Sequence, residues 1–197
     1  VGLNVPFVVA DAEARSANGT IVINRDTYAN LPENIAGGGS GATTITGNRT
    51  GNDDDMFAVC VSDANAFGAS LVGGATWDSQ LFLFDSAGLG VLHNDDDPND
   101  LGGATLQSNI TGVPLASGGL YYLLVTGWNR DPMSLGNQLI WNDDDGAGNF
   151  NTVRPADGPG AANPILLYLG AGNAGGAYTI TLSGANAVCP ADISNGA

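Results

Sequence analysis

Three runs of Asn-Asp-Asp-Asp constrain what this chain can fold into more than any other feature. They span residues 52–55, 94–97 and 142–145 and hold nine of the twenty acidic residues. Two like charges about 4 Å apart repel by about 4 kcal/mol at an effective dielectric constant near 20. The chain has no lysine and only five arginines, none of them within a run, so protein cations cannot neutralise all three runs. Each run is therefore expected either to stay in water or to bind a metal ion.

The composition predicts a folded chain of β-strands. A length of 197 residues fits one large domain or two small ones, and 43% hydrophobic residues suffice for a core. Thirty glycines, with few Glu or Gln residues and no Lys, argue against long helices. A net charge of −15 disfavours nucleic acid and anionic membrane surfaces as partners. No apolar run approaches the ~20 residues of a membrane span, which disfavours membrane insertion.

Short apolar segments, separated by Gly, Asn and Asp clusters, predict about ten strands. Their number and even spacing predict an all-β fold, a jelly-roll-like antiparallel β-sandwich. Residues 129–163 form the longest stretch without a predicted strand, and such a loop is usually functional or carries a small structure of its own. The predicted strands are 20–24, 43–46, 56–61, 66–72, 80–84, 90–92, 105–110, 121–126, 165–169 and 178–182.

Several of these strands are apolar on both faces instead of alternating. Residues 81–84, 121–125 and 165–169 show this pattern. One face is expected to pack in the sandwich core. The other must be covered by the long loop, the N-terminal segment or another molecule.

The central part of the chain carries an ordered set of motifs. It starts with Asp-Asp-Asp-Met-Phe at 53–57 and continues with the hairpin sequence at 77–88 and Asn-Asp-Asp at 94–96, and it ends with the Gly-x-Tyr strand at 176–182. This order resembles the bacterial pre-peptidase C-terminal domain family, a group of secreted β-sandwich modules. The resemblance covers residues 42–184 and implies a non-catalytic accessory role. In some relatives it implies bound calcium. Residues 1–41 form an N-terminal extension, 129–163 an insertion and 185–197 a tail.

Carboxylates and Asn carbonyls are hard oxygen ligands that suit Ca²⁺ better than zinc or copper. An extended run presents at most two ligands on one side. Calcium takes about six to eight oxygens, so each site needs partners from elsewhere, such as Asp78, Asp85 or Asp100. The alternative is a solvated acidic loop. From the runs and the resemblance together, the predicted calcium ligands are Asp53, Asp55, Asp78, Asn94, Asp95, Asp96, Asp97, Asp143, Asp144 and Asp145.

The two cysteines, Cys60 and Cys189, predict one disulfide that ties the tail to the core. Two separate thiols are the alternative. The sequence starts at Val1 instead of Met, which suggests a processed, secreted protein at the cell surface or outside the cell.

No catalytic site is predicted. The sequence has no Gly-x-Ser-x-Gly elbow and no zinc-ligand spacing. His93, the only histidine, is expected to be a neighbour of the second run instead of a base. A sugar-stacking platform is one interpretation of the three tryptophans, Trp77, Trp128 and Trp141. Trp77 and Trp128 lie at the ends of predicted strands, however, where packing in the core or at its rim is the commoner role.

Two functions of different classes fit the sequence. The first is a calcium-stabilised structural or adhesive subunit that self-associates, with an N-terminal strand completing a neighbour's sheet and forming a filament. The second is an accessory module of a secreted hydrolase that binds a polysaccharide or a matrix protein.

Overall fold

The computed structural model describes residues 43–50, 54–100, 104–142, 150–170 and 175–187. Within these ranges the chain forms thirteen β-strands and no helix. Among the described residues, therefore, no helix is long and apolar enough to cross a membrane. The strands are β1 (Thr44–Arg49), β2 (Asp55–Val61), β3 (Gly68–Ser70), β4 (Ser79–Asp85), β5 (Gly90–Asn94), β6 (Asn109–Ile110), β7 (Gly119–Gly127), β8 (Asp131–Ser134), β9 (Gln138–Leu139), β10 (Arg154–Pro155), β11 (Ile165–Leu169), β12 (Gly176–Ser183) and β13 (Ala185–Asn186).

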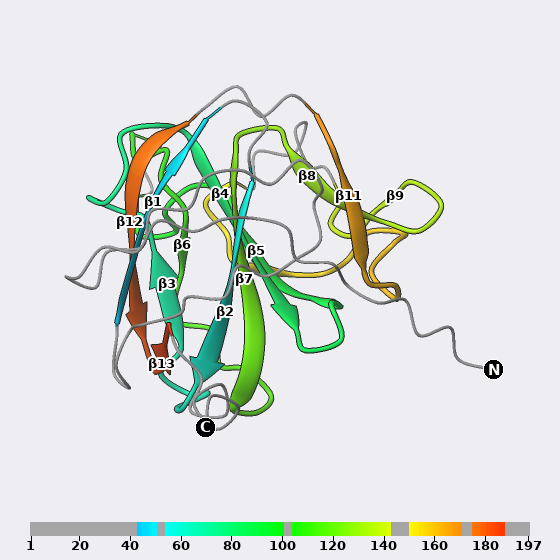
Figure 1. Ribbon diagram of the computed structural model, residues 1–197, viewed down its shortest axis with the longest axis horizontal. Coiled ribbons are helices and arrows are strands. Elements are labelled where there is room, and N and C mark those ends of the chain that lie inside the picture. Colours follow the sequence, from blue (N-terminus) through cyan, green and yellow to red (C-terminus); the bar gives the residue numbers. More distant parts are fainter. Residues whose placement is uncertain (1–42, 51–53, 101–103, 143–149, 171–174, 188–197) are drawn as a thin grey trace, which may run out of the picture.

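The strands form three antiparallel sheets (Figure 1). A four-stranded sheet has the order β1-β12-β3-β6, and a six-stranded sheet has the order β10-β5-β4-β7-β2-β13. A three-stranded sheet, β11-β8-β9, lies to one side of these two in Figure 1. The all-β sandwich predicted from the sequence is thus confirmed.

The main core lies between the four-stranded and six-stranded sheets. Odd-numbered side chains of β2, β4 and β7 point into it, where they meet Ile45 of β1 and alternate residues of β12. The residues that β2, β4 and β7 contribute are Phe57, Val59, Val61, Leu81, Leu83, Tyr121, Leu123 and Val125, and the same sheet adds Leu92 of β5 and Ala185 of β13.

A second core covers the opposite face of the six-stranded sheet. Even-numbered residues of the same strands, Met56, Phe82, Phe84 and Leu124, pack there against Ile140 and Trp141. Ile140 and Trp141 belong to the insertion at 129–163, where they directly follow β9. The long loop is therefore the element that covers the second apolar face, one of the three possibilities that the sequence left open.

The insertion at 129–163 is not a bare loop, because it contains β8, β9 and β10. These strands have only two to four residues, too few for an alternating pattern to be read from sequence. β8 pairs with β11, and β10 joins the edge of the six-stranded sheet beside β5. Of the predicted strands, 20–24 lies outside the described residues, and 66–72 and 105–110 are shorter in the structure, as β3 and β6.

Candidate functional site

The second acidic run and Asp78 meet at one end of the six-stranded sheet. Asp78 directly precedes β4, and Asp95 directly follows β5. These two strands are antiparallel neighbours, with Leu81 opposite Asn94. The start of one strand therefore lies beside the end of the other, and the hairpin brings together carboxylates that are 17 positions apart in sequence (95 − 78).

Three carboxylates form the cluster at this end. Asp78, Asp95 and Asp96 each offer an oxygen, and these oxygens all lie within 4.8 Å of one another. Asp95 is buried, and Asp78 and Asp96 are partly buried. The described residues contain no other group of three or more His, Cys, Asp or Glu side chains so arranged. The cluster can hold a metal ion.

The electrostatics of the cluster disfavour three bare negative charges. Burial, and then the negative charge of Asp96, raise the pKa of Asp78 to about 6. Burial, and then the charge of Asp100, raise the pKa of Asp96. Within the described part of the chain, the buried Oδ1 of Asp78 has no hydrogen-bond partner. An orphaned carboxylate oxygen beside two further carboxylates fits a hard cation, which would bind the oxygen and offset the repulsion.

The remaining members of the second run shape the loop. The Oδ1 of Asn94 accepts a hydrogen bond from the backbone N–H of Asn109 at 2.6 Å. The Oδ1 of Asp97 accepts from the backbone N–H and the side-chain amide of Asn99, both at 3.0 Å, and from the Nδ2 of Asn109 at 2.9 Å. The Oδ1 atoms of Asn94 and Asp97 thus position the loop, and the role of these two residues as calcium ligands stays a prediction.

The insertion closes over this loop. The backbone N–H of Asp96 donates to the carbonyl oxygen of Phe150 at 3.0 Å, and the Nδ2 of Asn151 donates to the carbonyl oxygens of Asp97 and Asp100 at 3.1 and 3.2 Å. The sequence gives no periodic signal for these contacts. They bring the chain that follows the third acidic run onto the second run.

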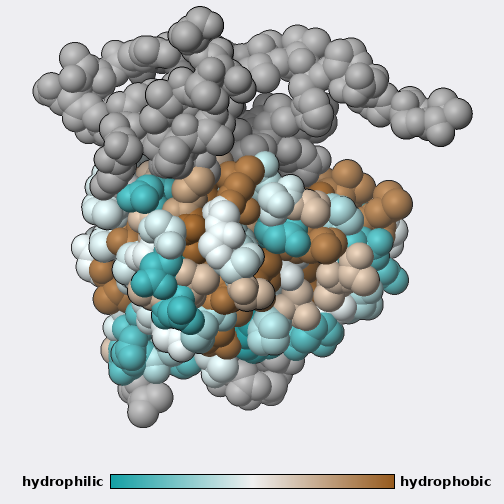
Figure 2. Space-filling model, turned by 90° about the horizontal axis from the view of Figure 1, so that it is seen from below, coloured by the Kyte–Doolittle hydropathy of each residue, from teal (hydrophilic) through white to brown (hydrophobic). Residues whose placement is uncertain are grey.

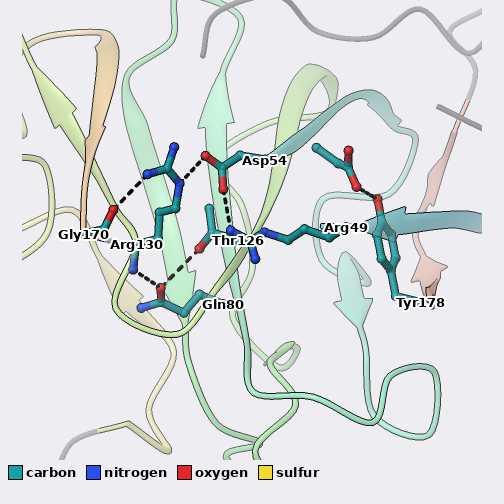
Figure 3. Close-up of polar contacts among 8 residues, drawn as sticks. Arg49, Asp54, Gln80, Thr126, Arg130, Gly170 and Tyr178 are labelled. Atoms are coloured by element: carbon teal, nitrogen blue, oxygen red, sulfur yellow. Dashed lines mark hydrogen bonds and ion pairs between the residues drawn. The ribbon is translucent and has the colours of Figure 1, made fainter. Parts of the chain in front are cut away.

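The described residues of the first acidic run, Asp54 and Asp55, lie at the same end of the sheet, where β2 begins, two strands away from β4. Asp54 is buried there between two arginines, with Arg49 Nη2 at 3.0 Å from its Oδ1 and Arg130 Nε at 2.5 Å from its Oδ2 (Figure 3). Burial raises the pKa of Asp54, although both guanidinium groups oppose that shift. Asp55 accepts a hydrogen bond from the Tyr178 hydroxyl. The three-carboxylate cluster does not include Asp55.

Several predicted site residues fall outside the described part of the chain. They are Asp53, Asp143, Asp144, Asp145 and Cys189. The calcium ligands among them stay predictions, as does the Cys60–Cys189 disulfide. Cys60 itself lies on β2, opposite Asn186 of β13, which is three residues before position 189.

Asp85 and Asp100, which the sequence suggests as additional calcium ligands, lie at two different places. Asp85 ends β4 and accepts hydrogen bonds from the N–H groups of Ala87 and Leu89 at 2.8 and 2.9 Å, so it shapes the hairpin turn at the far end of the strand. Asp100 accepts from the Ala104 N–H at 3.1 Å, and its charge acts on Asp96.

The tryptophans do not share a surface. Trp77 is buried in the main core and Trp141 in the second core, whereas Trp128 is 42% exposed. His93 is buried as well, stacked on Phe82. No protein-family model, curated protein or solved structure matches this chain.

Proposed function

We propose that this chain is a secreted, non-catalytic β-sandwich whose acidic end binds Ca²⁺, and that it acts as an extracellular structural or adhesive subunit. The observation that carries the proposal is the set of three carboxylates, Asp78, Asp95 and Asp96, with oxygens within 4.8 Å of one another. The ligands are all oxygen, and calcium is the abundant hard cation outside cells that accepts such irregular oxygen sets.

In this proposal the ion has a structural role. Asp78 directly precedes β4, and Asp95 and Asp96 directly follow β5. One ion bound to all three would therefore tie the start of β4 to the end of β5. It would also fix the loop that Phe150 and Asn151 of the insertion contact. The negative charge of the chain, −15, would fall with each bound ion, which lowers the repulsion between chains.

Terbium luminescence and thermal unfolding test the calcium site. Trp77 precedes Asp78 in sequence, so excitation of tryptophan is expected to sensitise Tb³⁺ bound at the cluster, and Ca²⁺ is expected to displace it. Calcium at about 100 times its dissociation constant should stabilise the fold by about 2.7 kcal/mol, and EDTA should reverse this.

Asp78→Asn is the matching variant, because it removes one charge and keeps the shape. Asp63→Asn is the control, since Asp63 is exposed and follows β2 at the opposite end of the sheet. The proposal requires loss of sensitised luminescence and of the calcium-dependent shift in Asp78→Asn alone. An unchanged Tm of the wild type in EDTA and in calcium would reject it.

Self-association is the second part of the proposed role. β1 lies at the edge of the four-stranded sheet and follows directly on the N-terminal extension, whose apolar segments 5–10 and 21–23 are the proposed donor strands. The other edges of the two larger sheets are β6, β10 and β13, which have two residues each and offer little to an added strand. The edges of the three-stranded sheet are β11, with five residues, and β9, with two. Light scattering and electron microscopy before and after deletion of residues 1–24 test this role. A monodisperse monomer in millimolar calcium would contradict it.

A binding module for polysaccharide or matrix protein is the second candidate. Trp128 at 42% and Leu169 at 49% exposure favour it, because aromatic and apolar side chains on a surface suit such ligands. On the face in Figure 2, however, apolar residues lie interspersed with polar ones. Loss of pull-down by insoluble polysaccharides in Trp128→Ala would support this function, and absence of any binding by the wild type would remove it.

A further inference from the structure

A buried threonine and a buried glutamine face each other across the middle of the six-stranded sheet. Gln80 of β4 and Thr126 of β7 are paired directly in the register of these strands. Thr126 is 0% exposed and Gln80 is 4% exposed. The Thr126 hydroxyl donates a hydrogen bond to the Gln80 Oε1 at 3.2 Å (Figure 3). An alcohol oxygen is thus held against the carbonyl of an amide, away from water.

The surrounding groups fix which end of the amide is oxygen. The backbone N–H of Arg130 also donates to Gln80 Oε1, at 3.2 Å, and the Nε2 donates to the Oδ1 of Asp131 at 3.3 Å. A rotated amide would place NH₂ against an N–H and oxygen against a carboxylate. The carbonyl oxygen therefore has two donors, and the nitrogen lies beside a carboxylate.

The donor at Arg130 is itself held in place. Its Nε contacts the buried Asp54, and its Nη1 donates to the Gly170 carbonyl at 2.9 Å (Figure 3). Its guanidinium carbon lies 5.1 Å above the centre of the Tyr168 ring. A residue anchored at three points cannot easily turn its backbone N–H away from the glutamine. Such fixed donors stabilise negative charge that develops on a carbonyl oxygen.

We propose that Thr126 and Gln80 join in an intramolecular ester cross-link between β7 and β4, with release of ammonia. The Thr126 Oγ1 attacks the Gln80 Cδ, and the carbonyl electron pair moves onto Oε1, where the Arg130 N–H stabilises it. When the pair returns, the Cδ–Nε2 bond breaks. The hydroxyl proton passes first to Oε1, to which it is hydrogen-bonded, and moves to the nitrogen as that bond breaks. The Asp131 carboxylate, which accepts a hydrogen bond from Nε2, stabilises the positive charge that the departing nitrogen gains. One C–O bond forms, one C–N bond breaks, and no oxidant or other reactant is needed.

The hydrogen bond between Thr126 and Gln80 keeps the two reacting groups together in one buried site. Well-oriented groups in one molecule react as if present at effective concentrations of about 10⁵ to 10⁸ M. Fixed hydrogen-bond donors in a dry site are worth more than the same donors in water. Burial of both side chains also excludes the water that would hydrolyse the ester.

The intact mass of the folded, full-length protein tests the proposal. After incubation at neutral pH, the wild type is expected to be lighter than its sequence by one molecule of ammonia. Cleavage before aspartates in denaturant then separates Gln80 from Thr126, and a branched peptide containing both is expected. Aspartates that lie between them are Asp85, Asp95, Asp96, Asp97 and Asp100.

Three variants distinguish the ester from other losses of ammonia. Thr126→Val keeps the shape but has no hydroxyl, and Gln80→Glu has no amide nitrogen at that position to release, so both should keep their full mass. Thr126→Ser keeps a nucleophile and should still lose ammonia, which also covers the case in which the valine variant does not fold. A cyclised asparagine would lose the same mass in all four proteins, and that pattern would overturn the proposal.

The role of Asp131 has its own readout. Asp131→Asn is expected to slow the appearance of the branched peptide by about 100-fold, because the departing nitrogen loses the carboxylate that stabilises its positive charge. A wild-type protein that retains its full mass after prolonged incubation and yields only separate peptides would overturn the cross-link.

Discussion

The imidazole of His93 lies flat on the ring of Phe82, with ring centroids 4.3 Å apart and planes only 9° apart. Trp141 lies on another side, 5.9 Å from the histidine ring. Neither ring nitrogen has a hydrogen-bond partner among the described residues. Burial, and then the nearby positive charge of Arg154, lower the pKa of His93 to about 3. The only histidine of the chain is thus held neutral inside an aromatic cluster.

The first prediction concerns the acid sensitivity that this histidine confers. In the unfolded chain the pKa of His93 is near 6.5, whereas in the folded protein it is about 3. Between these two pH values the imidazole is protonated in the unfolded state and neutral in the folded state. Its contribution to stability is fully present above pH 6.5 and is lost as the pH falls, by up to about 1.4 kcal/mol per unit. His93→Phe should stack equally well and reduce the slope of stability against pH between 6 and 4. Urea unfolding at several pH values measures it, and equal slopes in both proteins would contradict the assignment.

The second prediction concerns the pH dependence at Asp78. Its pKa in the folded protein, about 6, exceeds the ordinary 3.8, so without metal the folded state holds the proton more tightly than the unfolded state. That stabilisation is present below about pH 4 and is lost as the pH rises through 6. In EDTA, Asp78→Asn should therefore gain in Tm relative to the wild type as the pH rises from 4 to 7. With calcium the order should reverse, because only the wild type keeps the full ligand set. Asp63→Asn should show neither effect.

The third prediction concerns Asp54, the carboxylate that contacts both Arg49 and Arg130. The exposed fraction of the side chain is 0% for Arg49, 3% for Asp54 and 14% for Arg130. Asp54→Asn would remove the negative charge that both guanidinium groups contact, and breaking a buried pair from one side costs about 3–5 kcal/mol. Chemical denaturation measures the loss. The exposed Asp63→Asn should change stability by no more than about 0.5 kcal/mol, and a similarly small effect in Asp54→Asn would refute the ion network.

The fourth prediction compares two tryptophans. Trp141 is 4% exposed and its ring centroid lies 5.2 Å from that of Phe82 and 5.4 Å from that of Phe84. Trp141→Ala should cost about 3–5 kcal/mol and speed hydrogen exchange in β8 and β9. Trp128→Ala, at a 42% exposed position, should cost about 0.5 kcal/mol or less. Equal losses in the two variants would mean that Trp141 does not hold the second core together.

The apolar pattern of the strands predicts much of the fold. Residues 81–84 have no polar position, and this alone requires a cover on both faces of β4, which the two cores provide. The cover itself could not be located from sequence. β8, β9 and β10 are too short for periodicity to show, and Ile140 and Trp141 lie in an irregular segment after β9.

The candidate site was partly predictable for a similar reason. In a short antiparallel hairpin the start of the first strand lies beside the end of the second. Asp78 could therefore be placed beside Asp95 and Asp96 from their positions next to these two strands. The contacts of Asp54 depend instead on Arg130, 76 positions away, and on the order of β2, β7 and β8 in space. The same holds for Asn109, which contacts Asn94 and Asp97 only because β6 lies near the end of β5. No local sequence pattern predicts contacts between residues that lie so far apart in the chain.

The antiparallel pairing of β1 with β12 determines how the sandwich would respond to tension. Thr44 lies opposite Thr181, and the carbonyl of Thr43 accepts from the N–H of Leu182, so both strands leave the pair at the same end. A force that separates residues 43 and 183 would load these hydrogen bonds one at a time, like a zipper, instead of shearing them together. The peeling would run from Thr44 toward Arg49, where the ion pair with Asp54 adds resistance after the first five residues have come away. In a subunit that bears load, this edge would act as an extensible element that yields before the sheets separate.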